Sequence, residues 1–130
     1  MIAVDTSALM AFLLEEPEAE AVYDALLAAD GLAISAGTAA EALIVAGMRG
    51  VRAPMRLLME ELGMEIVPVT AAVAADMARA YHRWGKGVHP AGLNFGDCFA
   101  YTLAAARNIP LLCTGADFAQ TDIAMVIGPD

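Results

Sequence analysis

The chain has 130 residues, a length that suits one domain with a core of its own. Its hydrophobic share is 59%, much of it alanine, and its net charge is −9. Lysine and arginine are too few for a broad basic face, which argues against binding nucleic acid through such a face. We expect a single domain over residues 1–130 that approaches any polyanion through divalent cations or a local basic patch.

The cysteines and the chain start indicate a cellular compartment. Cys98 and Cys113 lie in apolar stretches outside any C-x-x-C motif, which is typical of reduced, buried thiols. Met1 leads directly into an apolar strand, without the basic region of a signal peptide. The apolar stretch 31–48 is interrupted by Glu41, so we do not interpret it as a membrane span. We expect a cytoplasmic protein with no membrane contact.

The first elements show a charge at the end of a buried strand. The chain opens with MIAVDTSAL, in which an apolar strand at 2–4 runs into Asp5 and two hydroxyl residues. A helix is expected at 7–14, and Pro17 interrupts it. The next helix, 18–29, begins with glutamates, which suit the positive end of a helix dipole. A carboxylate in this position is either a helix cap or part of a ligand site.

The middle of the chain repeats this alternation. A buried strand at 32–35 leads into an apolar helix at 39–48. The helix at 53–62 has a proline near its start, where proline is tolerated. A short strand at 65–67 ends before Pro68. The pattern is typical of strands joined by helical crossovers.

The last third supplies two more helices and two more strands. The helices are expected at 70–84 and 95–107, with the Gly- and Pro-rich loop GKGVHPAG between them and Asn94 as the second N-cap. Strands are expected at 111–113 and 124–127. Strands that alternate with helices and are apolar throughout predict an α/β fold with a mostly parallel sheet covered on both faces.

Four carboxylates stand in apolar surroundings, whereas most other acids lie in charged or turn segments. Each follows an expected strand or lies in the first turns of a helix, and these points share one edge of a parallel sheet. The chain has only seven Lys and Arg, none of them adjacent to these acids. The four are Asp5, Glu41, Asp97 and Asp117.

Four such acids at one edge favour a cation site. A charge in an apolar setting costs free energy unless it is paired or binds a metal, and carboxylates crowded together repel. Oxygen ligands favour a hard ion, Mg²⁺ or Mn²⁺. Such an ion can orient a phosphodiester and activate water for in-line attack.

Each acid also has a structural alternative. Asp5 is a natural N-cap, and Asp97 occupies the third helical position after the Asn94 cap. Asp117 suits a turn, and Glu41 can extend its carboxylate to solvent. The convergence of all four on one edge favours the metal site over four separate structural roles.

Four stretches carry a resemblance to a known family: MIAVDTSAL, TAAEAL, LNFGDCFAYTLA and LLCTGADFAQTDI. In this order and spacing they closely resemble the PIN domain, specifically the VapC toxins of bacterial toxin–antitoxin pairs. The resemblance covers the whole chain and implies a three-layer α/β/α fold with a central, mostly parallel sheet. It also implies a Mg²⁺- or Mn²⁺-dependent endoribonuclease acting on tRNA or rRNA, a homodimer, and neutralisation by a VapB-type antitoxin.

The resemblance assigns roles at the acidic edge. Asp5 and Asp97 are implied as the main metal ligands. Many relatives carry a second acid or a polar residue where TGADF has alanine, so Asp117 takes the fourth role and Asp122 is its alternative. The whole implied set is Asp5, Glu41, Asp97 and Asp117, with Ser7, Asn94 and Thr114 as polar support.

Two basic segments are candidates for contact with RNA. The first runs from a helix into the Gly-rich loop, with two aromatic residues that could stack on bases. Its alternative is a solvated helix end beside a mobile loop. Its residues are Arg79, Tyr81, His82, Arg83, Trp84, Lys86 and His89, with Arg79, Arg83 and Lys86 as the expected RNA contacts. The second segment, Arg49, Arg52 and Arg56, suits either a dimer interface or the substrate groove.

Other functions compete with the ribonuclease interpretation. A structure-specific DNA nuclease of the same fold would use the same metal site, and a catalytically silent PIN scaffold would keep the fold alone. An aspartyl phosphatase needs a second Asp where this chain has Ser7, and a receiver domain needs a lysine that LLCTGAD lacks.

Overall fold

A computed structural model describes residues 1–128, in which four parallel strands form one sheet in the order β3-β2-β1-β4. In the register of the central strand, Ile2 lies opposite Leu32 and Val4 lies opposite Leu112. The strands are β1 (Ile2–Val4), β2 (Leu32–Ser35), β3 (Glu65–Val67) and β4 (Leu111–Leu112). The predicted parallel sheet is confirmed.

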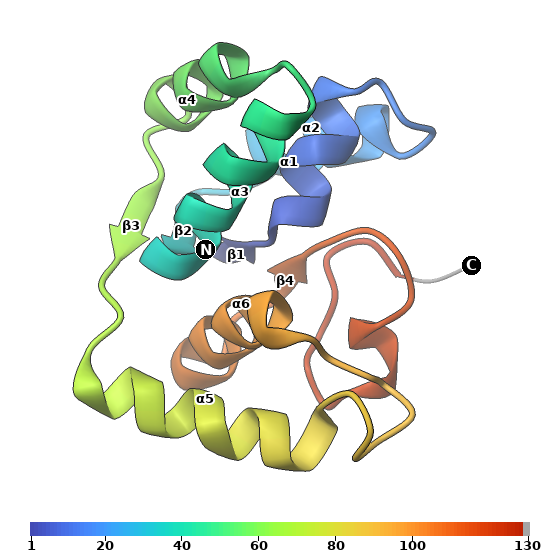
Figure 1. Cartoon of the computed structure of the whole chain (residues 1–130). Helices are drawn as coiled ribbons and strands as arrows, with labels where there is room; N and C mark the ends of the chain where they lie inside the picture. The colour runs from blue at the N-terminus through green and yellow to red at the C-terminus, as the bar shows by residue number, and fades with distance from the viewer. Residues whose placement is uncertain (129–130) are drawn as a thin grey trace.

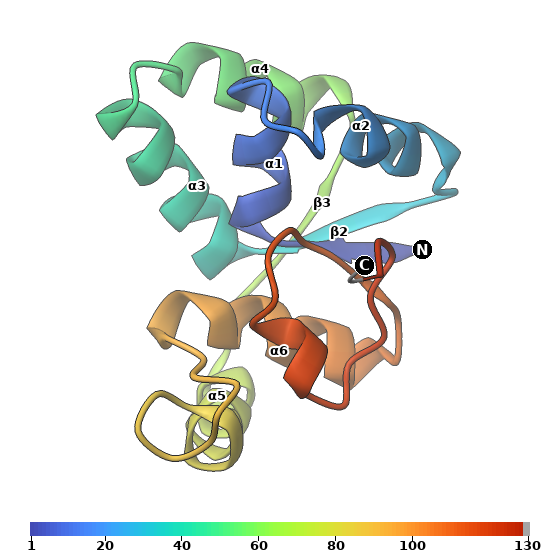
Figure 2. The ribbon, with the colours of Figure 1, turned by 90° about the vertical axis from the view of Figure 1, so that its right-hand side faces the viewer.

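Helices cover both faces of this sheet, so the predicted three-layer α/β/α fold is also confirmed. Figure 1 shows the sheet running through the middle of the molecule, and Figure 2 shows helices on both sides of it. The first layer holds α1 (Thr6–Leu13), α2 (Ala19–Ala28), α3 (Ala36–Met48) and α4 (Arg52–Glu61). The second layer holds α5 (Ala71–Trp84) and α6 (Phe95–Arg107).

The strand side chains divide between two cores. Ile2 and Val4 pack into the core beneath α1–α4, whereas Ala3 faces the core beneath α5 and α6. This alternation follows the two-residue period of a strand. The edge strand β3 differs, because Glu65 is exposed and Ile66 is 55% exposed. The expectation that all strands are buried on both faces is therefore wrong for β3.

Two boundaries differ from the prediction. The strand expected at 124–127 is wrong, because this segment forms a single parallel bridge, between Met125 and Leu111. Since β4 has only two residues, it offers too short a partner for a longer ladder. The helix expected at 39–48 begins at Ala36, because the Gly37 N–H donates to the Ser35 hydroxyl oxygen at 3.3 Å and caps the helix earlier.

Three further expectations concern membrane spans, the cysteines and the extent of the domain. No helix in the 128 described residues is long and apolar enough to cross a membrane. Cys98 and Cys113 are buried and unpaired, as predicted. The single domain expected over residues 1–130 includes residues 129–130, which lie outside the described part of the chain.

A glycine lets the two helical layers meet beside the sheet edge. A Cβ at Gly37 would lie 2.2 Å from Cδ1 of Phe99, far inside van der Waals contact. Only a residue without a side chain allows α3 to approach α6 this closely. This contact brings the start of α3, which carries Glu41, beside the start of α6, which carries Asp97.

Candidate metal centre

The first turns of α1, α3 and α6 gather at the carboxyl edge of the sheet (Figure 2). Helix α1 follows β1 directly, α3 follows β2, and the segment after β4 begins beside them. Helix α6 belongs to the second helical layer, on the other face of the sheet. This arrangement places residues from four parts of the sequence around one site, as expected for the crevice at the strand ends of a parallel sheet.

Asp5 caps α1 and keeps one oxygen unused. Its Oδ2 accepts hydrogen bonds from the Ser7 N–H at 3.1 Å and from the Ser7 hydroxyl at 2.7 Å. The capping alternative is therefore correct for this oxygen. The side chain is only 4% exposed, and Oδ1 is buried with no hydrogen-bond partner among the described residues. An unpaired buried carboxylate oxygen is costly and needs a ligand to explain it.

Burial opposes the ionisation of the Asp5 carboxyl group. It raises the pKa of Asp5 from 3.8 to about 6, against the lowering effect of the Ser7 hydrogen bonds. The negative charges of Asp97 and Glu41 raise this pKa further. These contributions show that the three carboxylates share one electrostatic environment.

Ser7 and Thr114 connect Asp5 to the end of β4. The Ser7 hydroxyl donates to Asp5 and accepts from the Thr114 N–H at 3.0 Å. The Thr114 hydroxyl lies 3.5 Å from the Ser7 carbonyl oxygen. Ser7 therefore contacts Asp5 directly, and Thr114 contacts Ser7.

Asp97 is held by the capping box of α6. Its N–H donates to Asn94 Oδ1 at 2.8 Å, and its Oδ2 accepts from the Asn94 N–H at 3.0 Å. The structural alternative for Asp97 is thus correct and compatible with a site role. Burial is the main cause that raises the pKa of Asp97, and the charges of Asp117 and Glu41 add to it.

Glu41 turns inward, which argues against the structural alternative in which its carboxylate extends to solvent. The Thr6 hydroxyl donates to Glu41 Oε1 at 2.7 Å. The other oxygen, Oε2, would lie 2.0 Å from a Cβ built on Gly96, so the carboxylate rests against the bare backbone one residue before Asp97. Sequence reasoning missed Thr6 and Gly96. Its only signal was that each adjoins a candidate ligand.

Asp117 and Asp122, the two alternatives for the fourth acid of the site, lie in different surroundings. Asp117 is exposed at the start of a short 3₁₀ helix, η1 (Phe118–Gln120), and its side chain makes no capping hydrogen bond there. Its charge raises the pKa values of both Asp97 and Cys113, so it lies beside the site.

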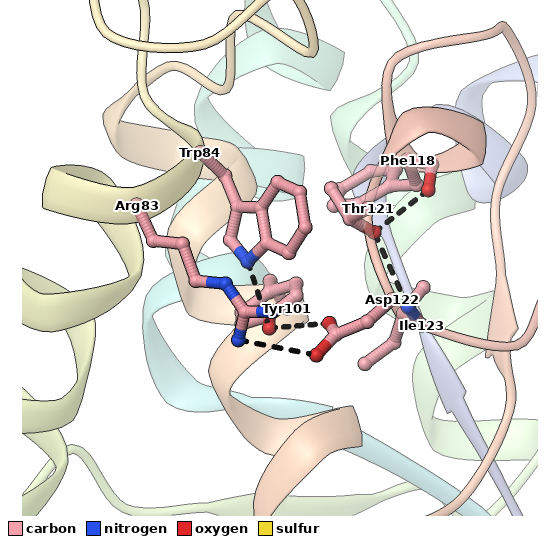
Figure 3. A network of polar contacts seen from close by, with 7 residues as sticks. All are labelled: Arg83, Trp84, Tyr101, Phe118, Thr121, Asp122 and Ile123. Carbon is pink, nitrogen blue, oxygen red and sulfur yellow. Dashed lines mark hydrogen bonds and ion pairs between the residues drawn. The ribbon is translucent and has the colours of Figure 1, made fainter.

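Asp122 belongs to a different network (Figure 3). Its Oδ1 accepts from the Tyr101 hydroxyl at 2.6 Å, and its Oδ2 lies 3.4 Å from Arg83 Nη1. Trp84 Nε1 donates to the same Tyr101 hydroxyl at 2.9 Å. Asp122 is therefore engaged in joining α5 and α6.

The acidic residues fit a cation that keeps part of its water shell better than a cation bound by protein ligands alone. Within residues 1–128, no three His, Cys, Asp or Glu side chains are arranged to hold one metal ion. Mg²⁺ commonly takes one or two carboxylates and completes its octahedron with water and substrate phosphate. The free Oδ1 of Asp5, with the neighbouring charge of Asp97, fits that ligand set.

Two arginines in the basic segment of α5 already contact other side chains of the protein. Arg79 pairs with Asp76, and the Arg83 guanidinium lies 4.5 Å from the centre of the Trp84 ring. Trp84 is buried, so the expectation that it stacks on bases is wrong. Tyr81 and Lys86 are exposed.

The second basic cluster lies at the turn between α3 and α4. Arg52 and Arg56 line a hollow of about 470 Å³, and a Cβ at Gly47 would lie 3.1 Å from Arg52 Nε. This turn is at the opposite end of α3 from the acidic residues.

These features define a three-layer α/β/α protein with a carboxylate cluster at the carboxyl edge of a parallel sheet. Residues 2–124 match the PIN domain, and the chain belongs to that family. The predicted family is thereby confirmed.

Several relatives share most of the chain. Ribonuclease VapC36 of Mycobacterium tuberculosis is 44% identical over 124 residues, covering 92% of this chain and 89% of the relative. Ribonuclease VapC30 of the same species is 41% identical over 131 residues, covering 97% and 98%.

Solved structures share the fold at lower identity. The crystal structure of VapC20 from Mycobacterium tuberculosis, described as a sarcin–ricin loop cleaving toxin, superimposes with a TM-score of 0.79 at 14% identity and covers 97% of this chain and 98% of that chain. VapBC-5 from the same species, a member of the VapBC family of toxin–antitoxin systems, gives 0.62 at 26% identity and covers 95% and 92%.

Proposed function

We propose that this protein is a VapC-type endoribonuclease, the toxin of a VapBC pair, and that it hydrolyses RNA with Mg²⁺ or Mn²⁺ at the acidic edge of its sheet. The observation that carries the proposal is the buried, unpartnered Oδ1 of Asp5 beside the charges of Asp97 and Glu41. Relatives at 41–44% identity that are named VapC ribonucleases support it. Transfer RNA or ribosomal RNA is the proposed substrate.

Each side chain has a distinct part in this proposal. Asp5 and Asp97 hold the cation, which, when bound, supplies positive charge to the scissile phosphate and lowers the pKa of water. Glu41 and Asp117 would accept hydrogen bonds from the attacking water and orient it for in-line attack, with one of the two carboxylates taking up the single proton that the water loses. Ser7 and Thr114 keep Asp5 in place through the contacts described above. Asn94 does the same for Asp97.

The metal site predicts a thermal response to the ion. Mn²⁺ at about a hundred times its Kd should stabilise the fold by about 2.7 kcal/mol, or roughly 10 °C in melting temperature. Asp97→Asn should reduce this shift while keeping the capping box, because an amide oxygen still accepts from the Asn94 N–H. The control is Asp24→Asn, at an exposed position on α2. Identical melting curves of the wild type in EDTA and in millimolar Mn²⁺ would contradict the site.

The proposed RNA contacts Arg79, Arg83 and Lys86 predict a change in salt dependence. Arg83→Ala and Lys86→Ala should weaken RNA binding and spare Mn²⁺ binding, with the salt slope falling by about 0.7 per lost contact to single-stranded phosphate. The control is Arg107→Ala, because Arg107 pairs with Glu65 near the far end of α6. Filter binding between low and physiological salt measures the slopes. Unchanged slopes in both the Arg83→Ala and the Lys86→Ala variants would remove these residues from the RNA surface.

We also propose two protein partners, a second copy of this chain and a VapB-type antitoxin. Solved structures from toxin–antitoxin systems share the fold, which supports the antitoxin. Large apolar side chains are exposed on α3 and α6, with Met48 79% and Phe95 71% exposed, which supports burial in an assembly. Light scattering should give twice the monomer mass at micromolar concentration. A monomer under those conditions would contradict the dimer, and purification from the native host without any bound partner would contradict the antitoxin.

A DNA nuclease of the same fold remains the second candidate function. Cleavage of matched RNA and DNA strands by the purified protein separates the two activities, and a silent scaffold would cleave neither.

We place the protein in the cytoplasm, a location supported by its free, buried cysteines.

A further inference from the structure

Thr6 makes the polar contact that orients Glu41. Its hydroxyl lies 2.7 Å from Glu41 Oε1 and 3.4 Å from the Thr38 carbonyl oxygen. A hydroxyl has one hydrogen to donate, and the shorter distance assigns it to the carboxylate. Thr6 itself is only 8% exposed, so water competes poorly for this bond. The contact joins α1 to α3 directly beside Asp5.

Gly96 limits where the second oxygen of Glu41 can lie. Any side chain at this position would overlap Oε2, which a Cβ would meet at 2.0 Å. The carboxylate is thus confined between a hydroxyl on α1 and bare backbone on α6. Oε1 accepts the hydrogen bond from Thr6. The other oxygen, Oε2, lies against Gly96, the residue that precedes Asp97 in the chain. Thr6 therefore determines which oxygen of Glu41 remains available to the acidic site.

We propose that Thr6 is a positioning residue that holds Glu41 in a single orientation, with Oε1 bound and Oε2 directed at the cation and water of the acidic site. This inference rests on the proposed metal-dependent function. A partner that orients a ligating or water-binding carboxylate is expected to affect metal affinity even though it does not touch the ion.

The experiment compares Thr6→Val, which keeps the shape and removes the donor, with Thr6→Ser, which keeps the donor and removes the methyl group. Mn²⁺ is titrated into each purified full-length variant and followed by electron paramagnetic resonance. Thr6→Val should bind Mn²⁺ about 10- to 100-fold more weakly, and Thr6→Ser should stay near the wild type. Thr102→Val is the matched control, because it removes a buried hydroxyl that has no hydrogen-bond partner among the described residues.

A second measurement tests the contact without metal. In EDTA, a double-mutant cycle of Thr6→Val and Glu41→Met, which removes both acceptor oxygens and keeps a side chain of similar length, should show coupling of about tenfold in the unfolding equilibrium constant. Zero coupling overturns the proposal, as does wild-type Mn²⁺ affinity in Thr6→Val or equal losses in Thr6→Val and Thr6→Ser. If the wild type binds no Mn²⁺, the proposed function fails, and the cycle alone then decides whether Thr6 positions Glu41.

Discussion

Asp5→Asn should abolish RNA cleavage, lowering its rate by about 10³-fold or more, while the protein stays folded. Asp5 Oδ2 serves the N-cap of α1, and an amide oxygen can accept the same hydrogen bonds from Ser7. What the substitution removes is the negative charge beside the buried Oδ1. A hard cation contributes several kcal/mol to a phosphoryl transition state, and each 1.36 kcal/mol is a factor of ten in rate, so roughly a thousandfold is at stake.

The measurement is cleavage of total tRNA and of a short single-stranded RNA, with circular dichroism to confirm the fold. Asp24→Asn is again the control, since it changes the net charge equally at an exposed position of α2. Asp122→Asn is an informative comparison, because Asp122 bonds Tyr101 and Arg83 outside the acidic site and its substitution should leave cleavage largely intact. Full activity of a folded Asp5→Asn protein would contradict both the metal site and the proposed ribonuclease mechanism.

The stability of the metal-free protein should fall between pH 4 and pH 7 because of Asp5. Its pKa is raised from 3.8 to about 6, mainly by burial. Below pH 4 the carboxyl is protonated in both the folded and the unfolded state. Between the two pKa values the unfolded state ionises while the folded state keeps its proton, so the folded state binds more protons and the free energy of unfolding decreases. Above pH 6 the loss is complete, at about 3 kcal/mol for a shift of roughly two pKa units.

Comparison with Asp5→Asn isolates this contribution from the other titrating groups. Unfolding in urea with EDTA, measured from pH 4 to pH 7.5, should show the variant gaining stability over the wild type as the pH rises. The buried amide changes the free energy of unfolding by an amount that does not depend on pH, so it does not alter how the difference between variant and wild type changes with pH. Asp24→Asn is the control, because it removes one negative charge at an exposed position outside the acidic site. Parallel pH profiles for wild type and Asp5→Asn would show that Asp5 ionises normally in the folded protein.

The amino-acid sequence alone determined the architecture and the candidate ligands. Alternating apolar strands and helices specify a parallel sheet, since each strand must be followed by a crossover that covers a face. The acids Asp5, Glu41 and Asp97 stand out because a charge in apolar surroundings is expensive without a partner. Local capping chemistry was also readable, and the structure contains the Asn94–Asp97 capping box.

Contacts between segments far apart in the chain could not be derived in this way. The sequence left Asp117 and Asp122 as alternatives for the fourth acid, and it did not show that Asp122 contacts Tyr101 and Arg83, which come from other elements. Trp84 appeared available to RNA because its segment is basic, but packing against α6 buries it. Burial of this kind depends on which helix faces lie together, which one-dimensional spacing does not specify.

The orientation of the site was decided by the tertiary structure. Gly37 and Gly96 appear in the sequence as ordinary small residues, yet both lie at close contacts between α3 and α6. Thr6 reads as the neighbour of a candidate ligand, but its hydroxyl engages Glu41, 35 residues away. The sequence determined which charges the site contains, because their cost is local. Only the fold decided where each oxygen points, because that depends on backbones and hydroxyl groups brought together from three helices.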